Sequence, residues 1–167
     1  GGAFQQGITP IAMMAAPSFN DSFVREGFAL APLFTSGSMY VTAFTQPYEA
    51  NTPGHAAMRA TFEAVGQNTG NLFVTAGWTS QYHLRDVLQA AIKGGDLTRA
   101  GIRRAAANVN VSSDQMMPTK NLGQEGGQTE TYVGVPTADN LSGISTLAWP
   151  YTGPTAAAKD WSAGPCS

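Results

Sequence analysis

Residues 39–58 read MYVTAFTQPYEANTPGHAAM, and this stretch decides the fold. Its first six residues are mostly β-branched, aromatic or apolar, which predicts a β-strand. An extended connector follows at 45–51. Thr52 can then cap a helix that has Pro53 in its first position, where the missing N–H is no loss, and that ends near Gly66. A strand that passes through a connector into a capped helix indicates an α/β protein.

Upstream of this stretch lies an apolar run at 11–16, IAMMAA, with a proline on each side. Its shortness and its proline boundaries predict a buried strand of a parallel sheet. The residues that precede it, up to Gly7, have the character of the last turn of a helix. The loop at 17–20 offers N-cap side chains, so we expect a short helix over 21–28.

Downstream, a helical hairpin is predicted. An apolar stretch at 72–76 leads to Gly77-Trp78-Thr79, and Gly94-Gly95 and Thr98 supply a helix stop and a new helix start, with the second helix running through Ala106. Trp78 is expected to open the first helix, whose apolar residues recur at helical spacing: Leu84, Val87, Leu88 and Ala91.

The C-terminal third has a different character, because Gly, Pro, Asn, Gln and Thr dominate it. Only 131–135 and 144–149 have the β-branched and aromatic content of strands. Residues 150–167 are expected to form a peripheral tail. This region is therefore predicted to be irregular and strand-rich.

The composition points to an exported protein. Charged residues make up 12% of the chain, about half of the usual share, and the net charge is -2. Runs of like charge do not exceed Arg103-Arg104, which excludes nucleic acid as a partner. The single cysteine, Cys166, suggests a bond to another chain, a free thiol or a partner outside this sequence; a tolerated exposed thiol is the alternative.

Three segments, in this order of elements, resemble type I periplasmic-type solute-binding proteins, such as the receptors for branched-chain amino acids. Residues 40–44 leading into 52–58 resemble the family's strand and inter-lobe crossing. Gly77-Trp78 before a long helix, and then 94–102, GGDLTRAGI, resemble its long helix, Gly-rich turn and next helix start. The chain would correspond to the C-terminal portion, somewhat under half, of a full-length member.

The resemblance implies part of a two-lobe type I periplasmic-binding fold, in which parallel-sheet lobes flanked by helices close around a solute like a hinge. Residues 1–44 would belong to the second lobe and 45–110 would cross and return to the first lobe. Residues 111–149 would return to the second lobe, and 150–167 would be the peripheral tail. Strand edges and a sheet face should then be incompletely buried, because the missing N-terminal portion would cover them.

Five residues are candidates for ligand binding. Ser18, Phe19 and Asn20 follow the first predicted strand, and open parallel sheets bind ligands beyond the carboxyl ends of their strands. Trp78 would wall the cleft from the other lobe, and Tyr48 lies in the crossing. The alternatives are that Ser18 or Asn20 only caps the next helix, that Trp78 packs in the core, and that Tyr48 lines the hinge.

No catalytic constellation or metal site is expected. Ser80, His83 and Asp86 have the residue types of a triad, but their spacing spreads them around one helix, and no Gly-x-Ser-x-Gly elbow surrounds the serine. The two histidines, His55 and His83, and the single cysteine form no metal-ligand spacing. No cofactor is expected.

The leading hypothesis is therefore the solute-binding component of an ABC importer, and not an enzyme. It would capture a small polar organic solute, an amino acid or a related compound, and deliver it to a membrane permease. We expect it to be exported, in the periplasm or at the cell surface, with a lipid anchor on the missing N-terminal portion as one form of attachment. The alternatives are a ligand-sensing receptor or regulatory domain of the same fold and, more weakly, a serine hydrolase.

Overall fold

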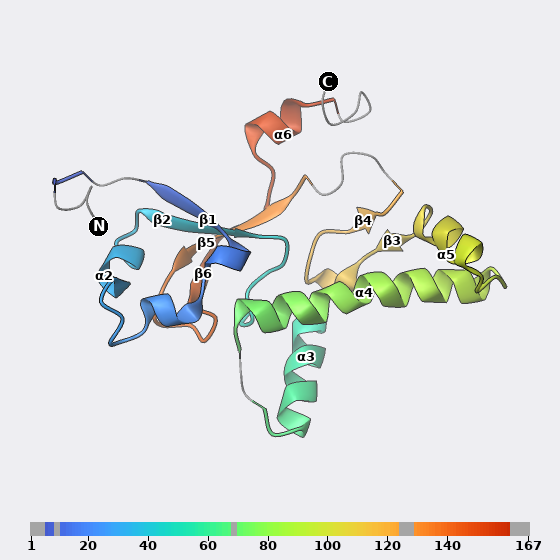
Figure 1. Cartoon of the computed structure of the whole chain (residues 1–167), viewed down its shortest axis with the longest axis horizontal. Helices are drawn as coiled ribbons and strands as arrows, with labels where there is room; N and C mark the ends of the chain where they lie inside the picture. Colours follow the sequence, from blue (N-terminus) through green and yellow to red (C-terminus); the bar gives the residue numbers. More distant parts are fainter. Residues whose placement is uncertain (1–5, 9–10, 68–69, 124–128, 161–167) are drawn as a thin grey trace.

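The fold is described from a computed structural model, which covers residues 6–8, 11–67, 70–123 and 129–160. A four-stranded sheet lies at one end of the molecule, and a long helix runs away from it to the other end, where a shorter helix pairs with it (Figure 1). In chain order the elements are β1 (Ala12–Ala15), η1 (Ala16–Ser18), η2 (Asp21–Val24), α2 (Ala31–Phe34), β2 (Met39–Ala43), α3 (Pro53–Ala64), α4 (Leu72–Lys93), α5 (Arg99–Ala106), β3 (Asn110–Val111), η3 (Ser113–Gln115), β4 (Lys120–Asn121), β5 (Thr131–Pro136), β6 (Ile144–Tyr151) and α6 (Pro154–Ala158).

The sheet has the strand order β1-β2-β5-β6. β1 and β2 are parallel, with Ala12 opposite Met39, as the prediction of a parallel sheet requires. The two late strands add antiparallel neighbours, β5 beside β2 and β6 beside β5. The strand predictions at 39–44, 131–135 and 144–149 are confirmed, whereas the short β3–β4 ladder was not predicted.

β1 is not the buried strand that its apolar run suggested. It is an edge strand, with Ile11 80% and Met13 67% exposed and every second residue only half-buried. A continuous apolar run is typical of a strand whose two faces are both covered by other elements. Within the described residues nothing covers the outer face of β1, in agreement with the expected incomplete burial.

The loop after β1 forms less helix than predicted. The expected helix over 21–28 is only the four-residue 3₁₀ turn η2, which ends at Val24. Asn20 caps it, since its side-chain oxygen accepts a hydrogen bond from the N–H of Ser22 at 2.9 Å. The rings of Phe23 and Phe28 stack on each other with 5.3 Å between their centroids, and Phe34 of α2 lies 5.0 Å from Phe23 in a tilted arrangement.

The helix after the crossing begins as its sequence predicts. Pro53 occupies the first position of α3, and the hydroxyl oxygen of Thr52 accepts the N–H of His55 at 3.3 Å. Since the first helical N–H groups have no partner within the helix, this cap satisfies one of them.

α4 is longer than expected and begins before Trp78. Asn71 is its cap, accepting the N–H of Val74 at 2.9 Å, so the stretch 72–76 forms its first turns and Gly77 lies inside it. The helix ends at Lys93, followed by Gly95 with φ +69°. The turn between α4 and α5 is thus confirmed, and Thr98 caps α5.

The apolar residues that recur along α4 are not all buried. Val87 and Ala91 are buried, but Leu84 is 57% exposed and Ile92 62% exposed. The apolar stripe of α4 is therefore wider than the surface that α5 covers. At the C-terminus, β6 extends to Tyr151 and α6 follows, so the tail has more structure than a simple strap, while Cys166 lies outside the described residues.

Two hydrophobic clusters hold the molecule together. The first lies between the sheet, its flanking 3₁₀ turns and the start of α4, and the second lies between the crossing, α3, α4 and the β3–β4 region. The members of the first are Phe19, Val24, Val41, Ala43, Leu72, Tyr132 and Ile144; those of the second are Tyr48, Met58, Tyr82, Val111 and Met116.

Candidate functional site

A groove lies where the carboxyl ends of β1 and β2 meet the first turns of α4. Its volume is about 320 Å³, and we call it the strand-end groove. Ligands of open parallel sheets bind at this edge, which makes the groove the candidate site. Its lining residues are Ala15, Ala16, Pro17, Thr42, Ala43, Phe44, Leu72, Phe73, Ala76 and Thr131.

The start of α4 is held against the sheet by its own first residue. Leu72 is 3% exposed and belongs to the core cluster of the sheet. The next residue, Phe73, is 50% exposed and lines the groove, and across it Phe44 at the end of β2 is 41% exposed. Two aromatic rings from segments far apart in the sequence thus present surface to the same groove.

The groove offers almost no polar chemistry. None of the described residues that line it carries a charge. Its two hydroxyl groups are already engaged, since Thr131 donates to the carbonyl of Ala43 at 2.8 Å and Thr42 donates to that of Met14 at 3.4 Å. The surface that this chain contributes is therefore apolar.

The loop predicted to bind ligand lies next to the groove. Ser18 is exposed directly after Pro17, a lining residue, and Asn20 is exposed while its side-chain oxygen caps η2. The ring of Phe19 is 1% exposed and packs in the core, which leaves only its backbone for a ligand. The capping alternative thus describes Asn20, and core packing accounts for Phe19.

The structure does not bring Trp78 to the groove. Its ring packs with the second cluster, 6.1 Å from the ring of Phe62 between centroids, and faces a small pocket of about 240 Å³ with Tyr82 and Arg85. The groove-facing aromatic of α4 is Phe73, five residues earlier. Asn71 is the signal that could have found it, because a cap there places Phe73 in the first turn.

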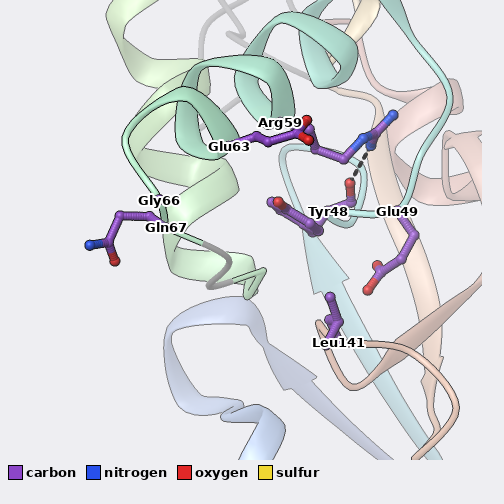
Figure 2. A pocket seen from close by; sticks show the side chains of 7 residues that line it. All are labelled: Tyr48, Glu49, Arg59, Glu63, Gly66, Gln67 and Leu141. Atoms are coloured by element: carbon purple, nitrogen blue, oxygen red, sulfur yellow. Dashed lines mark hydrogen bonds between the residues drawn. The ribbon is translucent and has the colours of Figure 1, made fainter.

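Tyr48 lies at a second, larger pocket between the crossing and α3, with a volume of about 620 Å³ (Figure 2). Tyr48 is only 6% exposed, and its carbonyl oxygen accepts a hydrogen bond from Arg59 at 2.7 Å. Arg59 also donates to the carbonyl of Ala50 at 3.0 Å. Because this guanidinium holds the crossing itself, we regard the strand-end groove as the better candidate site.

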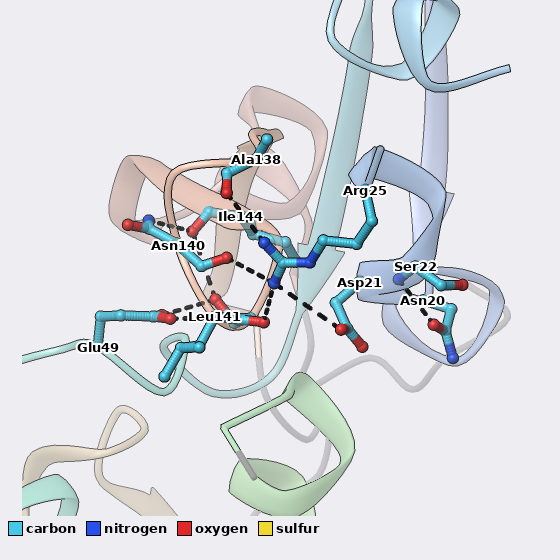
Figure 3. Close-up of polar contacts among 10 residues, drawn as sticks. Asn20, Asp21, Ser22, Arg25, Glu49, Ala138, Asn140, Leu141 and Ile144 are labelled. Atoms are coloured by element: carbon cyan, nitrogen blue, oxygen red, sulfur yellow. Dashed lines mark hydrogen bonds and ion pairs between the residues drawn. The ribbon is translucent and has the colours of Figure 1, made fainter. Parts of the chain in front are cut away.

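The crossing is anchored to the rest of the chain at both ends. At its start, the hydroxyls of Thr45 and Thr79 are fully buried 3.1 Å apart, and that of Thr45 donates to the carbonyl of Met116 at 3.0 Å. Further along, Glu49 accepts two hydrogen bonds from Ser142, in the loop that joins β5 to β6 (Figure 3). These contacts fix the crossing to α4 on one side and to the sheet on the other.

Arg25 holds the same β5–β6 loop from the opposite side (Figure 3). Its guanidinium donates to the carbonyls of Ala138 and Asn140 at 2.9 Å and to that of Leu141 at 2.6 Å. Gly143 lets the β5–β6 loop lie close to η2, since its φ is +75° and a Cβ there would lie 2.9 Å from the Cα of Asp21. The loop is thus fixed to η2 and to the crossing together.

His55 is a buried neutral histidine. Burial lowers its pKa from 6.5 to about 4, with the cation of Arg59 acting in the same direction, and its hydrogen bond to the Gln46 carbonyl opposes the shift. The nitrogen Nε2 faces that carbonyl at 3.4 Å and therefore carries the proton, which leaves Nδ1 to accept from the hydroxyl of Thr52 at 2.7 Å. His55 thus fastens the start of α3 to the crossing.

The triad residue types are engaged separately. The hydroxyl of Ser80 donates to the carbonyl of Gly77 at 2.8 Å, and Asp86 accepts from Arg85 at 2.7 Å. Within the described part of the chain no hydrogen bond joins Ser80, His83 and Asp86, and no group of three or more potential metal ligands is found there.

Among the helices of the described residues, none has both the length and the apolar character needed to span a membrane.

The fold matches those of two solved solute-binding proteins. A fatty acid ABC transporter substrate-binding protein from Thermomonospora curvata is similar with a TM-score of 0.78 at 16% sequence identity, over 95% of this chain and 41% of that chain. A branched chain amino acid ABC transporter from Thermus thermophilus, solved with bound valine, is similar with a TM-score of 0.63 at 11% identity, over 93% of this chain and 42% of that chain. No protein-family model and no curated protein matches the sequence.

The chain therefore has the type I periplasmic-binding fold of ABC transporter substrate-binding proteins, as the sequence resemblance predicted. It spans about two fifths of the length of the two solved structures. Both of these structures are of substrate-binding transporter proteins.

Proposed function

We propose that this protein is the solute-binding component of an ABC importer, which captures a small organic solute between two lobes and delivers it to a membrane permease. The observation that carries the proposal is the strand-end groove, which lies at the ligand-binding edge of the sheet in a chain with the fold of such proteins. An amino acid or a related compound is the proposed solute. Its polar groups would be held by the exposed loop residues Ser18 and Asn20 and by the rest of the cleft.

The lobe division follows the sequence boundaries. Residues 1–44 and 111–149 would form the second lobe and 45–110 the crossing and part of the first, while 150–167 would be peripheral. The two separate clusters and the crossing that links them support a division into two lobes. The clusters depart from these boundaries at Leu72, which packs with the sheet, and at Val111 and Met116, which pack with α3 and α4. The N-terminal portion of the same fold would be the main structural partner.

Exposed apolar side chains indicate where that portion would pack. Ile11, directly before β1, and Met13 of β1 are exposed at the edge strand, and Leu84 and Ile92 are exposed on α4. An open strand edge and an apolar helix stripe are surfaces that folded proteins usually cover.

The solute-binding component of an ABC importer would work outside the cytoplasm, in the periplasm or at the cell surface.

Titration calorimetry of the protein at its natural length, against a panel of amino acids and small organic acids, tests the proposal. We expect one solute class to bind with a Kd of about 1 mM or tighter, which corresponds to at least about 4 kcal/mol. A panel without a single binder would contradict the proposal. Turnover of a panel compound would instead favour an enzyme.

A further inference from the structure

We propose that the strand-end groove binds the hydrocarbon part of the solute, and that this part is longer than the side chain of an aliphatic amino acid. This inference rests on the proposed function and deepens it by naming the chemical class of the solute: an amphipathic molecule with a medium-length alkyl or aryl group.

The lining of the groove favours an apolar occupant over a polar one. Its walls are alanines, a proline, a leucine and two aromatic rings, and its two threonine hydroxyls donate to backbone carbonyls of their own sheet. A polar solute group buried here would lose its hydrogen bonds to water without gaining others, which costs several kcal/mol per group in an apolar setting. A hydrocarbon group has no such penalty.

The construction of the groove distinguishes it from the uncovered apolar stripe of α4. Phe44 directly follows β2 and Phe73 lies in the first turn of α4, while Ala16 of η1 and Ala76 of α4 are small lining residues that leave space. Leu84 and Ile92 do not line the groove, although each is at least as exposed as Phe73. The groove is therefore a concavity built by several elements, which is the shape of a ligand site.

The size of the groove sets the length of the hydrocarbon. Its volume of about 320 Å³ equals roughly ten water-sized volumes of about 30 Å³ each, and a methylene group is of similar size. The groove therefore has room for a chain of about six to ten carbons. An amino-acid side chain such as that of valine would fill only a part of it.

A chain-length series tests the inference. The ¹⁵N-labelled protein is titrated with butanoate, hexanoate and octanoate below their micelle concentrations, and with glutamine as a polar comparison, while backbone amide shifts are followed. Burial of a methylene contributes about 0.8 kcal/mol, so each added methylene should tighten binding about three- to fourfold. The largest shifts should fall at Phe44, Phe73 and Ala76, and glutamine should bind much more weakly than octanoate.

Two variants and a matched control locate the effect. Phe73→Ser should weaken octanoate binding about five- to tenfold, while Leu84→Ser, which removes a similarly exposed apolar side chain from the same helix, should leave it unchanged. Ala76→Leu keeps the groove apolar but fills it, and should weaken octanoate more than butanoate. Because Phe73 and Leu84 are both exposed, neither serine variant should disturb folding, which circular dichroism checks.

Each contrary result has a distinct meaning. Affinity that does not depend on chain length, or glutamine bound as well as octanoate, would overturn the hydrocarbon inference and leave the proposed solute-binding function standing. If Leu84→Ser weakens octanoate binding as much as Phe73→Ser does, octanoate adsorbs to exposed apolar surface in general. This result would also overturn the hydrocarbon inference. If none of the four compounds binds, the inference fails, and the calorimetric panel then decides the proposed function separately.

Discussion

Glu49 accepts two hydrogen bonds from Ser142, one from its backbone N–H at 2.8 Å and one from its hydroxyl at 2.6 Å. The two residues are 93 positions apart in the sequence. Glu49 belongs to the crossing and Ser142 to the loop between β5 and β6, so this pair connects the part of the chain that leaves the sheet with the part that returns to it. Ser142 is only 1% exposed, so water cannot readily replace the carboxylate.

The first prediction concerns this pair. Glu49→Ala should lower the free energy of unfolding by about 1–3 kcal/mol, because the buried N–H and hydroxyl of Ser142 lose their acceptor. Urea denaturation followed by circular dichroism measures the change. Glu63→Ala is the control, since Glu63 is an exposed carboxylate that lines the same pocket, and it should change stability by less than about 0.5 kcal/mol. Equal effects of the two substitutions would contradict a specific role of Glu49.

The second prediction concerns Arg25. Its planar guanidinium donates to three carbonyls of the β5–β6 loop, a geometry that a lysine ammonium cannot reproduce. Arg25→Lys should therefore cost about 1–2 kcal/mol even though the charge is kept. Arg103→Lys on the exposed side of α5 is the matched control and should be close to neutral. Amide hydrogen exchange at Asn140 and Leu141 should accelerate in the Arg25 variant alone.

Local signals in the sequence were sufficient for most of the elements. Thr52 and Thr98 are both followed by helices that they cap, and the β-branched stretch at 131–135 is a strand. These features depend on neighbouring residues, so a single sequence contains them. The start of α4 differs from the prediction because Gly77-Trp78 has the pattern of a helix opening, whereas the helix begins after its cap at Asn71.

The candidate site could be placed only roughly from the sequence. The parallel strand order predicts a ligand site beyond the carboxyl end of β1, and the strand-end groove lies at this edge, while its role in binding stays a prediction. Which aromatic residue of α4 faces the groove depends on the rotation of the helix against the sheet. That rotation is fixed by Leu72 entering the core, a tertiary contact that no local pattern reveals.

A third prediction follows from His55. Because burial lowers its folded-state pKa to about 4, below the 6.5 of an ordinary histidine, the unfolded chain binds more protons between these two values. The stability that His55 contributes is therefore present above about pH 6.5 and is lost as the pH falls toward 4, by at most about 3 kcal/mol.

Denaturation of the protein and of the His55→Gln variant across this pH range tests the direction in which stability changes with pH. Glutamine has no proton to gain, so the variant should be less stable at pH 7 but should show a shallower loss of stability between pH 6.5 and 4. An NMR titration of the His55 ring in the folded protein should show it neutral down to about pH 4. Identical pH slopes for the two proteins would contradict the burial of a neutral ring.

The fourth prediction uses two glycines of different surroundings. Gly77 lies inside α4, and a Cβ added there would meet no atom within 4 Å, so Gly77→Ala should stabilise the protein by about 0.5–1 kcal/mol through helix propensity alone. A Cβ at Gly70 would overlap the ring of Tyr48, which is itself buried. Gly70→Ala must therefore displace this ring or the backbone before α4, and we expect a loss of about 1–3 kcal/mol. Thermal unfolding of the two variants should shift in opposite directions, and a stabilising Gly70→Ala would show that the ring of Tyr48 does not pack on this glycine as described.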